Sequence, residues 1–441
     1  MDKKRILVFS ADAMVCEDIE QLRKLPNFKK YLANGCEVSD GMKTIYPSVT
    51  YPAHVSMATG CYPNRHGVTS NFDFTTDDKD QKWKWFKEAY SVEDIFSAAK
   101  REGYSTAALS WPVTGKHENI DWLMDEYWMP NEGDTLRSSF KDAGSSEEML
   151  DIIERNAKYL PEGYERGGKS NFMKWPQVDE FIIRVACDVI REHTPEVMFV
   201  HTGTFDSYRH AYGMFNSRLT EAVGNLDRYI GMLMEACKDA GVLQNTNLVL
   251  VSDHGQQDIK RVINLNVLLA DRKYIDVEDS GNVKDYKAFC FSNAMSALVY
   301  LKNPQDENLW KEIYEYLLFL EKEGIYGIEK VYTREEIDKL EHLSGNFSFV
   351  IESDGYTSFA DSAIRPIVQK FDESDYRMGR ATHGYLPEYG PQPVFLAKGP
   401  DFKENTIIPR ANVIDEAPTY ATILGIKLPD ADGKAIKEFI R

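Results

Sequence analysis

Three apolar segments of the sequence are each followed by an acidic residue. Asp12 follows RILVFSA, Asp206 follows EVMFVHTGTF, and Asp253 follows NLVLVS. If the segments are strands of one open α/β sheet, these carboxylates lie at the edge where such sheets bind ligands. Carboxylates buried together are costly unless cations neutralise them. We therefore expect a metal site here rather than three separate helix caps.

Three histidines accompany these acidic residues. His254 is adjacent to Asp253, His210 comes four residues after Asp206, and His383 precedes a glycine in ATHGYLP. One helical turn or a tight loop would bring Asp206 and His210 to the same point. Three carboxylates and three imidazoles form the nitrogen and oxygen ligand set that zinc or manganese favours. The six side chains can be divided between two ions.

A nucleophile is suggested by residues 46–68, YPSVTYPAHVSMATGCYPNRHGV, which contain Thr50 and Cys61. The Cys-Tyr-Pro-Asn-Arg run is similar to the Cys-x-Pro-x-Arg signature around the modified cysteine of sulfatases. A threonine hydroxyl becomes a good nucleophile when a metal ion coordinates it, because the metal favours the alkoxide. Pro52 and the AHVSMATG run predict that Thr50 lies at or near a helix N-terminus, where free backbone N–H groups would also favour an anion.

Taken in order, these residues resemble the alkaline phosphatase superfamily, and most of all its nucleotide pyrophosphatase/phosphodiesterase branch. The branch motif Thr-aromatic-Pro-x-His is matched by residues 50–54, and Thr-Gly-x-Tyr-Pro-x-x-His-Gly by residues 59–67. The Asn that follows shortly afterwards is matched by Asn71, and HGYLPEYGPQPVFLAKGPDFK is similar to the last metal-ligand segment. In sulfatases the modified cysteine precedes Thr-Gly-x-Tyr-Pro by nine residues. Counting back nine from Thr59 reaches Thr50, so the resemblance favours Thr50 over Cys61.

The resemblance implies a two-metal hydrolase with an alkaline phosphatase-like fold. One ion would be held by Asp206, His210 and His383, and the other by Asp12, Asp253 and His254, with Thr50 as a further ligand. We expect zinc, with manganese or iron as alternatives. Two ions about 3.5–4 Å apart would hold the attacking and leaving oxygens of an in-line displacement at phosphorus. Thr50 would attack and form a phosphothreonine.

Asn71 and Tyr51 are the expected substrate-binding residues. Asn71 would donate a hydrogen bond to a non-bridging oxygen, or else serve only as a turn residue. Tyr51 would form an aromatic wall for the substrate, or else pack as a core ring. The branch usually has glycine where this chain has Ala13 and Arg209, and Arg209 would meet either a phosphate or a surface carboxylate. These departures leave the metal ligands intact but weaken the case for nucleotides as substrates.

Along the chain, short apolar runs alternate with helical patterns, and these elements must position the residues described above. This alternation predicts a three-layer αβα core with a mostly parallel sheet. Strands are expected at 5–10, 105–110, 196–201, 247–252 and 394–397, and helices at 91–102, 178–192, 219–240 and 413–424, the first capped by Ser91. Residues 1–254 and 381–441 form the predicted catalytic core, with an insertion at about 114–174. Residues 255–380, with strand-like 288–301 and helical 307–322, form a predicted inserted α+β cap subdomain.

Composition limits the partners. The chain has 441 residues and a net charge of −18, which argues against a nucleic-acid polymer or an anionic membrane. We expect a small phosphorylated substrate, while the oligomeric state is unknown. The N-terminal apolar run is too short for a signal peptide and no segment looks long enough to span a bilayer. With six scattered cysteines and no CxxC pair, the expected location is cytoplasmic.

Several functions stay open at this point. The first is hydrolysis of phosphodiester or phosphoanhydride bonds, favoured because the sequence supplies Tyr51 and few obvious cations for a phosphomonoester. A phosphonate hydrolase similar to phosphonoacetate hydrolase, or a phosphomonoesterase, would use the same centre. A phosphomutase-type isomerase is disfavoured because its relatives use serine. A non-catalytic binding protein is disfavoured because all six ligands and the nucleophile are present.

Overall fold

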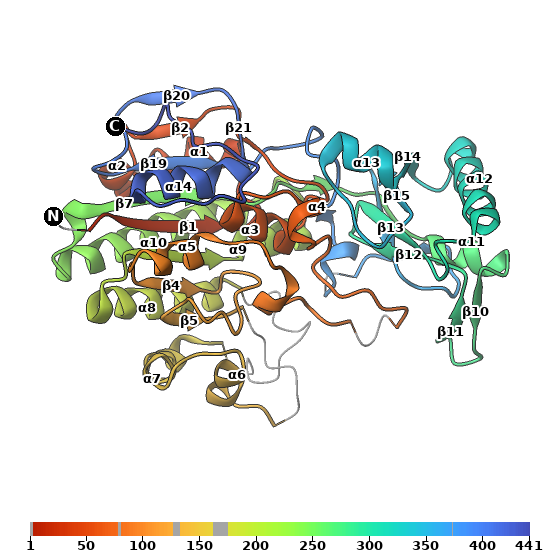
Figure 1. Cartoon of the computed structure of the whole chain (residues 1–441), viewed down its shortest axis with the longest axis horizontal. Coiled ribbons are helices and arrows are strands. Elements are labelled where there is room, and N and C mark those ends of the chain that lie inside the picture. The colour runs from red at the N-terminus through yellow and green to blue at the C-terminus, as the bar shows by residue number, and fades with distance from the viewer. Residues whose placement is uncertain (1–2, 78–80, 127–132, 162–174, 373) are drawn as a thin grey trace.

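A computed structural model describes residues 3–441 except for 78–80, 127–132, 162–174 and 373. Figure 1 shows a larger layered body built around β1 and β7, and a second lobe containing β10–β15 and α11–α13. Within the described residues, no helix combines the length and the apolar character needed to cross a membrane.

An eight-stranded sheet forms the centre of the larger body. Its spatial order is β20 (Thr406–Ile408), β2 (Cys36–Val38), β19 (Phe395–Lys398), β7 (Thr246–Val251), β1 (Arg5–Ala11), β6 (Val197–Thr202), β4 (Thr106–Leu109) and β5 (Trp122–Met124). The five strands from β7 to β5 are parallel to one another. Strand β19 is antiparallel to both of its neighbours. The predicted mostly parallel sheet is confirmed.

Helices cover both faces of this sheet, and strand β1 shows how the faces divide. Leu7 and Phe9 belong to one hydrophobic core, and Ile6 and Val8 to another, because successive side chains of a strand point to opposite faces. The first core also contains residues of α1 (Cys16–Leu22), α2 (Pro26–Tyr31), α7 (Glu147–Asn156), α8 (Trp175–His193) and α10 (Leu219–Asp239). The second contains residues of α3 (Thr50–Thr59), α5 (Ile95–Arg101) and α14 (Glu416–Leu424). These layers are the predicted αβα core.

Helix α5 begins later than the sequence pattern suggested. Asp94, not Ser91, is its N-cap, and the Asp94 carboxylate accepts a hydrogen bond of 2.8 Å from the backbone N–H of Ser97. The carboxylate is held in place by Tyr90 and His117, at 3.0 and 2.9 Å. The prediction of a Ser91 cap was wrong because a buried aspartate with its own partners occupies the capping position.

Residues between β7 and β19 build further sheets. An antiparallel sheet has the order β12 (Ala288–Ser292), β13 (Ser296–Leu301), β15 (Phe349–Ser353), β14 (Ile328–Thr333). Near it lie α11 (Leu265–Asp271), α12 (Glu307–Glu323), α13 (Arg334–Glu341) and the hairpin β10 (Ile275–Val277)–β11 (Val283–Tyr286). Strand β9 (Arg261–Asn264) pairs with both β16 (Thr357–Ala360) and β17 (Val368–Gln369). The predicted strand and helix patterns of this region are therefore present.

This region leaves and rejoins the core at neighbouring points. Strand β8 (Gln257–Asp258) pairs antiparallel with β18 (Ala381–Thr382). The first follows His254 by a few residues, and the second directly precedes His383. The pairing therefore brings the segment after one predicted ligand beside the segment before another. The boundaries at 255 and 380 stay a prediction.

The predicted insertion at 114–174 contributes to the sheet as well as to its surroundings. Strand β5 is the edge strand of the central sheet, and α6 (Leu136–Asp142) and α7 follow it. Parts of this range, 127–132 and 162–174, lie outside the described residues. The remaining short elements are β3 (Met42–Lys43), which pairs with β21 (Ala411–Asn412), the helix α4 (Pro63–His66), and α9 (Thr204–Tyr212).

Candidate metal centre and active site

Three neighbouring strands of the central sheet end at the candidate site. The order β7-β1-β6 places their carboxyl ends side by side. Asp12 directly follows β1, Asp253 follows β7, and Asp206 lies in the first turn of α9, which begins just after β6. All three side chains are buried. The structure thus brings together the three carboxylates predicted to meet at this edge.

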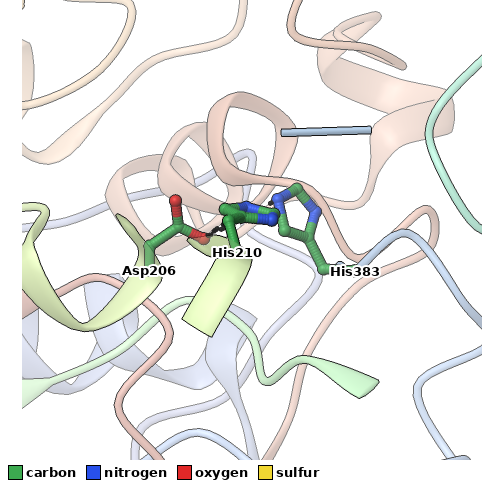
Figure 2. Close-up of side chains that lie close together, drawn as sticks. All are labelled: Asp206, His210 and His383. Atoms are coloured by element: carbon green, nitrogen blue, oxygen red, sulfur yellow. Dashed lines mark ion pairs between the residues drawn. The ribbon is translucent and has the colours of Figure 1, made fainter. Parts of the chain in front are cut away.

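One group of potential metal ligands consists of Asp206, His210 and His383, called here the Asp206 cluster. Its ligand atoms lie within 4.8 Å of one another, and Figure 2 shows both rings turned toward the carboxylate. Nε2 of His210 is 3.0 Å from Oδ1 of Asp206, one helical turn earlier, and Nε2 of His383 is 3.9 Å from the same oxygen. Residues from α9 and from the segment after β18 therefore meet at one point.

The ring of His210 is held in one tautomer. Its Nδ1 lies 2.7 Å from the carbonyl oxygen of Ala381, and a carbonyl only accepts, so Nδ1 carries the hydrogen. Nε2 is then the ring nitrogen directed toward Asp206, and it is the one available to a metal ion. This contact also ties α9 to β18, and hence to the neighbouring His383.

The second group, called here the Asp12 cluster, consists of Asp12, Asp253 and His254, again with ligand atoms within 4.8 Å of one another. Nε2 of His254 lies 3.6 Å from Oδ1 of Asp12 and 3.2 Å from Oδ2 of Asp253. The two clusters adjoin, because the rings of His254 and His383 stack with centroids 4.0 Å apart. The six predicted ligands thus form two adjacent sites of three.

Charges in this centre are unbalanced without cations. Oδ1 of Asp12 and Oδ2 of Asp253 are buried and have no hydrogen-bond partner among the described residues. Burial, and then the neighbouring Asp253, raises the pKa of Asp12 well above its ordinary value. Burial tends to raise the pKa of Asp206, but His210, His254 and Gln256 together outweigh burial and leave this pKa below its ordinary value. Orphaned carboxylate oxygens beside an imidazole nitrogen fit a divalent cation in the Asp12 cluster, and the Asp206 cluster offers a second group of three ligand atoms.

Thr50 lies beside this centre, at the first residue of α3. Its Oγ1 is 3.1 Å from Nε2 of His254, so the predicted nucleophile adjoins a ligand of the Asp12 cluster. The helix start predicted for Thr50 is confirmed, but the expected row of free N–H groups is not. The Tyr51 N–H is donated to Asn71, and Pro52 has none. An anion here would depend more on the helix dipole than on direct backbone hydrogen bonds.

Asn71 contacts the start of α3 and also lines the cavity. Its Oδ1 accepts a hydrogen bond of 2.9 Å from the backbone N–H of Tyr51. This contact fixes the amide group, since only the oxygen can accept, and leaves the Nδ2 donor for other partners. Asn71 lines the same cavity as Thr50. A locally structural contact thus orients the donor that the substrate-binding role requires.

A small cavity of about 40 Å³ opens at the centre. It is lined by Asp12, Thr50, Tyr51, Asn71, Trp83, Glu126, Gly203, Asp206, Tyr376 and His383. Tyr51 both lines the cavity and packs as a core ring, with its centroid 5.2 Å from that of Trp83. Trp83, Glu126 and Tyr376 were not among the predicted site residues. They come from three distant segments, and no local motif marks them.

The surroundings of Cys61 and Arg209 argue against the roles considered for these two residues. Cys61 is buried, contacts the carbonyl oxygen of Asp430 at 3.2 Å, and has a pKa raised by burial to about 11. A thiol of that pKa is a weak nucleophile at neutral pH. Arg209 is wholly buried and pairs with Asp18 at 2.5 Å, so neither a surface salt bridge nor a free phosphate-binding role describes it.

The layered α/β fold is that of the alkaline phosphatase-like proteins, as solved structures show. Murine ectonucleotide pyrophosphatase/phosphodiesterase 5 matches with a TM-score of 0.64 and 19% identity over 98% of each chain. An inactive threonine-to-alanine variant of that protein, in complex with AMP, matches with a TM-score of 0.66 and 18% identity over 100% of each chain.

A model of the Type I phosphodiesterase / nucleotide pyrophosphatase family matches residues 6–386, and the chain belongs to this family. Human ectonucleotide pyrophosphatase/phosphodiesterase family member 1 is 25% identical over 278 residues, covering 62% of this chain and 26% of that protein. Venom phosphodiesterase CdcPDE of Crotalus durissus collilineatus is 22% identical over 456 residues, covering 98% of this chain and 46% of that protein. The chain therefore spans a quarter to a half of the length of these relatives.

Proposed function

We propose that this protein is a two-metal hydrolase of phosphodiester or phosphoanhydride bonds, with Thr50 as the nucleophile. The observation that carries the proposal is the position of Thr50 at the start of α3, with Oγ1 3.1 Å from His254 of the Asp12 cluster. A threonine-to-alanine variant of a protein with a similar fold is described as inactive, which supports this role for Thr50.

The Asp206 cluster and the Asp12 cluster would each hold one divalent cation, with zinc proposed for both. When bound, these ions would neutralise the carboxylates and the phosphoryl oxygens and would favour the alkoxide form of Thr50. The fit rests on the orphaned oxygens of Asp12 and Asp253 and on the imidazole nitrogens directed at them.

The residues of the chain account for the remaining steps. Thr50 Oγ1 forms a bond to phosphorus while the bond from phosphorus to the leaving oxygen breaks, which yields a phosphothreonine. Water then displaces Thr50 from phosphorus, so the net reaction is hydrolysis. Asn71 Nδ2, oriented by the Tyr51 backbone contact, donates to a non-bridging oxygen of the phosphoryl group.

The charge of the cavity favours a diester over a monoester. Among the described residues that line it there is no lysine or arginine, while Asp12, Glu126 and Asp206 are acidic. A phosphomonoester dianion carries one more negative charge than a diester and would find no cationic side chain here to offset it. Relatives named as phosphodiesterases agree with this preference.

The test compares the zinc-loaded protein on bis(4-nitrophenyl) phosphate and on 4-nitrophenyl phosphate. We expect a clear preference in kcat/KM for the diester and loss of both activities after exhaustive chelation. A preference for the monoester, or full activity without metal, would overturn the proposal.

We also propose a cytoplasmic location. All six cysteines are free thiols and five of them are buried, which suits a reducing compartment. Fractionation of cells that express the intact protein tests this, and recovery outside the cytoplasm would contradict it.

A further inference from the structure

Glu126 is a buried acidic residue of the cavity for which the proposed mechanism has no use. It follows β5, the edge strand of the central sheet, and lines the cavity together with Thr50 and His383. Only 8% of its surface is exposed, and its Oε2 has no hydrogen-bond partner within the described part of the chain. A buried carboxylate oxygen without a partner is costly, so this group calls for a ligand.

The hydroxyl of Tyr51 is a second unpartnered group in the same cavity. Tyr51 is 1% exposed, and its hydroxyl oxygen finds no hydrogen-bond partner among the described residues. Burial, and then the charge of Glu126, raises the pKa of Tyr51, while burial raises the pKa of Glu126 and its contact with Tyr51 opposes that rise. The two side chains therefore face each other directly, although neither oxygen reaches good hydrogen-bond geometry. One ligand group placed between them could satisfy both.

The surroundings of this pair favour a cation. The described lining has several carboxylates and no lysine or arginine, as noted above. Its three aromatic rings are Tyr51, Trp83 and Tyr376, with the Trp83 centroid 5.2 Å from that of Tyr51 and 6.2 Å from that of Tyr376. Carboxylates and aromatic faces both attract ammonium groups. A neutral alkyl group would offer no hydrogen-bond donor to Glu126 Oε2.

We propose that Glu126 and Tyr51 form a subsite that recognises a protonated primary amine on the alcohol that stays attached to phosphorus. This rests on the proposed phosphodiesterase function. A primary ammonium can donate N–H hydrogen bonds to Glu126 Oε2 and to the Tyr51 oxygen, whereas a quaternary ammonium has no N–H to donate. The cavity of about 40 Å³ has room for only a few water-sized groups, which suits a short aminoalkyl chain.

The experiment compares two nitrophenyl diesters on the zinc-loaded protein. 2-Aminoethyl 4-nitrophenyl phosphate carries the ammonium, and propyl 4-nitrophenyl phosphate replaces it with a methyl group of similar shape. We expect wild type to favour the amino ester in kcat/KM by roughly ten- to a hundred-fold. Glu126→Gln should bring this ratio close to one, and Tyr51→Phe should lower it several-fold. Glu118→Gln, which removes an exposed charge from the same stretch of chain, should keep the wild-type ratio.

The outcomes separate this subsite from the proposed function. If wild type hydrolyses neither ester nor bis(4-nitrophenyl) phosphate, the phosphodiesterase proposal fails, whereas hydrolysis of bis(4-nitrophenyl) phosphate alone rejects only the amine subsite. If it hydrolyses both equally well, or if Glu126→Gln keeps the wild-type ratio, only the amine subsite is wrong. A trimethylammonioethyl ester that matches the amino ester would also overturn it, as would loss of one bound zinc in Glu126→Gln, because Glu126 would then be a metal ligand. If Glu126→Gln does not fold, Tyr51→Phe decides, and an unchanged ratio in that variant rejects the subsite.

Discussion

The rings of His54 and His201 form a T-shaped pair next to the Asp12 cluster, with Nε2 of His54 3.0 Å from Nδ1 of His201. Nδ1 of His54 donates to the backbone carbonyl oxygen of Thr50 at 2.8 Å. Nε2 of His201 lies 3.4 Å from Oδ2 of Asp12. Burial lowers the pKa of both rings to about 3, so both are neutral at physiological pH. The pair lies between the backbone of the proposed nucleophile and a proposed metal ligand.

His201→Asn should therefore weaken zinc binding to the Asp12 cluster. Groups that orient a metal ligand from behind typically contribute 10- to 100-fold in affinity, and we expect a loss of about that size. Titration with zinc against a competing chelator measures it. His66→Asn is the matched control, because His66 is equally buried but contacts Ser56 rather than a proposed ligand. Equal zinc affinity in wild type and His201→Asn would show that His201 only fills space.

Thr50→Ala should separate catalysis from metal binding. Removing the nucleophilic oxygen is expected to lower kcat on a diester by at least roughly 10³-fold. The bound zinc should remain close to two per chain, since both three-residue clusters are intact. Thr59→Ala, at the other end of α3 and outside the cavity, should keep turnover near that of wild type. Substantial activity in Thr50→Ala would rule out a phosphothreonine.

The sequence predicted those residues of the site that lie in recognisable local patterns. Asp12, Asp206 and Asp253 were predictable because each follows an apolar strand, and parallel strands bring their carboxyl ends to one edge. His210 followed from its helical spacing to Asp206. Glu126, by contrast, lies just beyond a short edge strand and has no motif around it.

Other features depend on contacts between distant segments, which spacing does not reveal. Tyr376 reaches the cavity from the region between β7 and β19, and its ring stacks on His383 with centroids 5.1 Å apart. Asp94 replaced Ser91 as a helix cap because Tyr90 and His117 hold its carboxylate. Arg209 looked exposed in sequence, but its partner Asp18 lies 191 positions earlier in the chain.

Removal of the metals should destabilise the fold as well as abolish activity. Without cations, Asp12 and Asp253 are buried together with unpartnered oxygens, and their mutual repulsion opposes folding. A ligand at a hundred times its Kd adds about 2.7 kcal/mol to the free energy of unfolding per site. Differential scanning calorimetry before and after chelation measures the change in Tm, and zinc should restore it. An unchanged Tm would mean that the clusters do not bind the added metal.

Glu352 should make the free energy of unfolding depend on pH. Burial raises the pKa of this carboxyl from 4.5 to about 8, while contacts from Tyr46 and the Leu386 N–H oppose the rise. The folded form then binds a proton that the unfolded chain has released. Stability from this group is full below pH 4.5 and is lost as the pH rises toward 8.

Glu352→Gln is neutral at every pH and removes this dependence. In the window from 4.5 to about 8, the free energy of unfolding of wild type should fall relative to the variant by up to about 1.4 kcal/mol per pH unit. Urea denaturation at several pH values measures the difference. Glu118→Gln, at an exposed position, should run parallel to wild type. If Glu352→Gln also ran parallel, the carboxyl would not be protonated in the fold.

Arg209→Met should be among the most destabilising single changes near the site. The guanidinium pairs with Asp18 at 2.5 Å and also donates to the carbonyl oxygens of Ala13 and Met214. Its removal leaves a buried carboxylate without its cation, which typically costs about 3–5 kcal/mol. Because Arg209 joins the residue after Asp12 to the helix that carries His210, zinc affinity should fall together with stability.

Urea denaturation and zinc titration measure the two effects, and Arg137→Met, which breaks exposed ion pairs only, should leave both nearly unchanged. Stability close to that of wild type in Arg209→Met would mean that Asp18 finds another partner, and that the ion pair does not hold these two segments together.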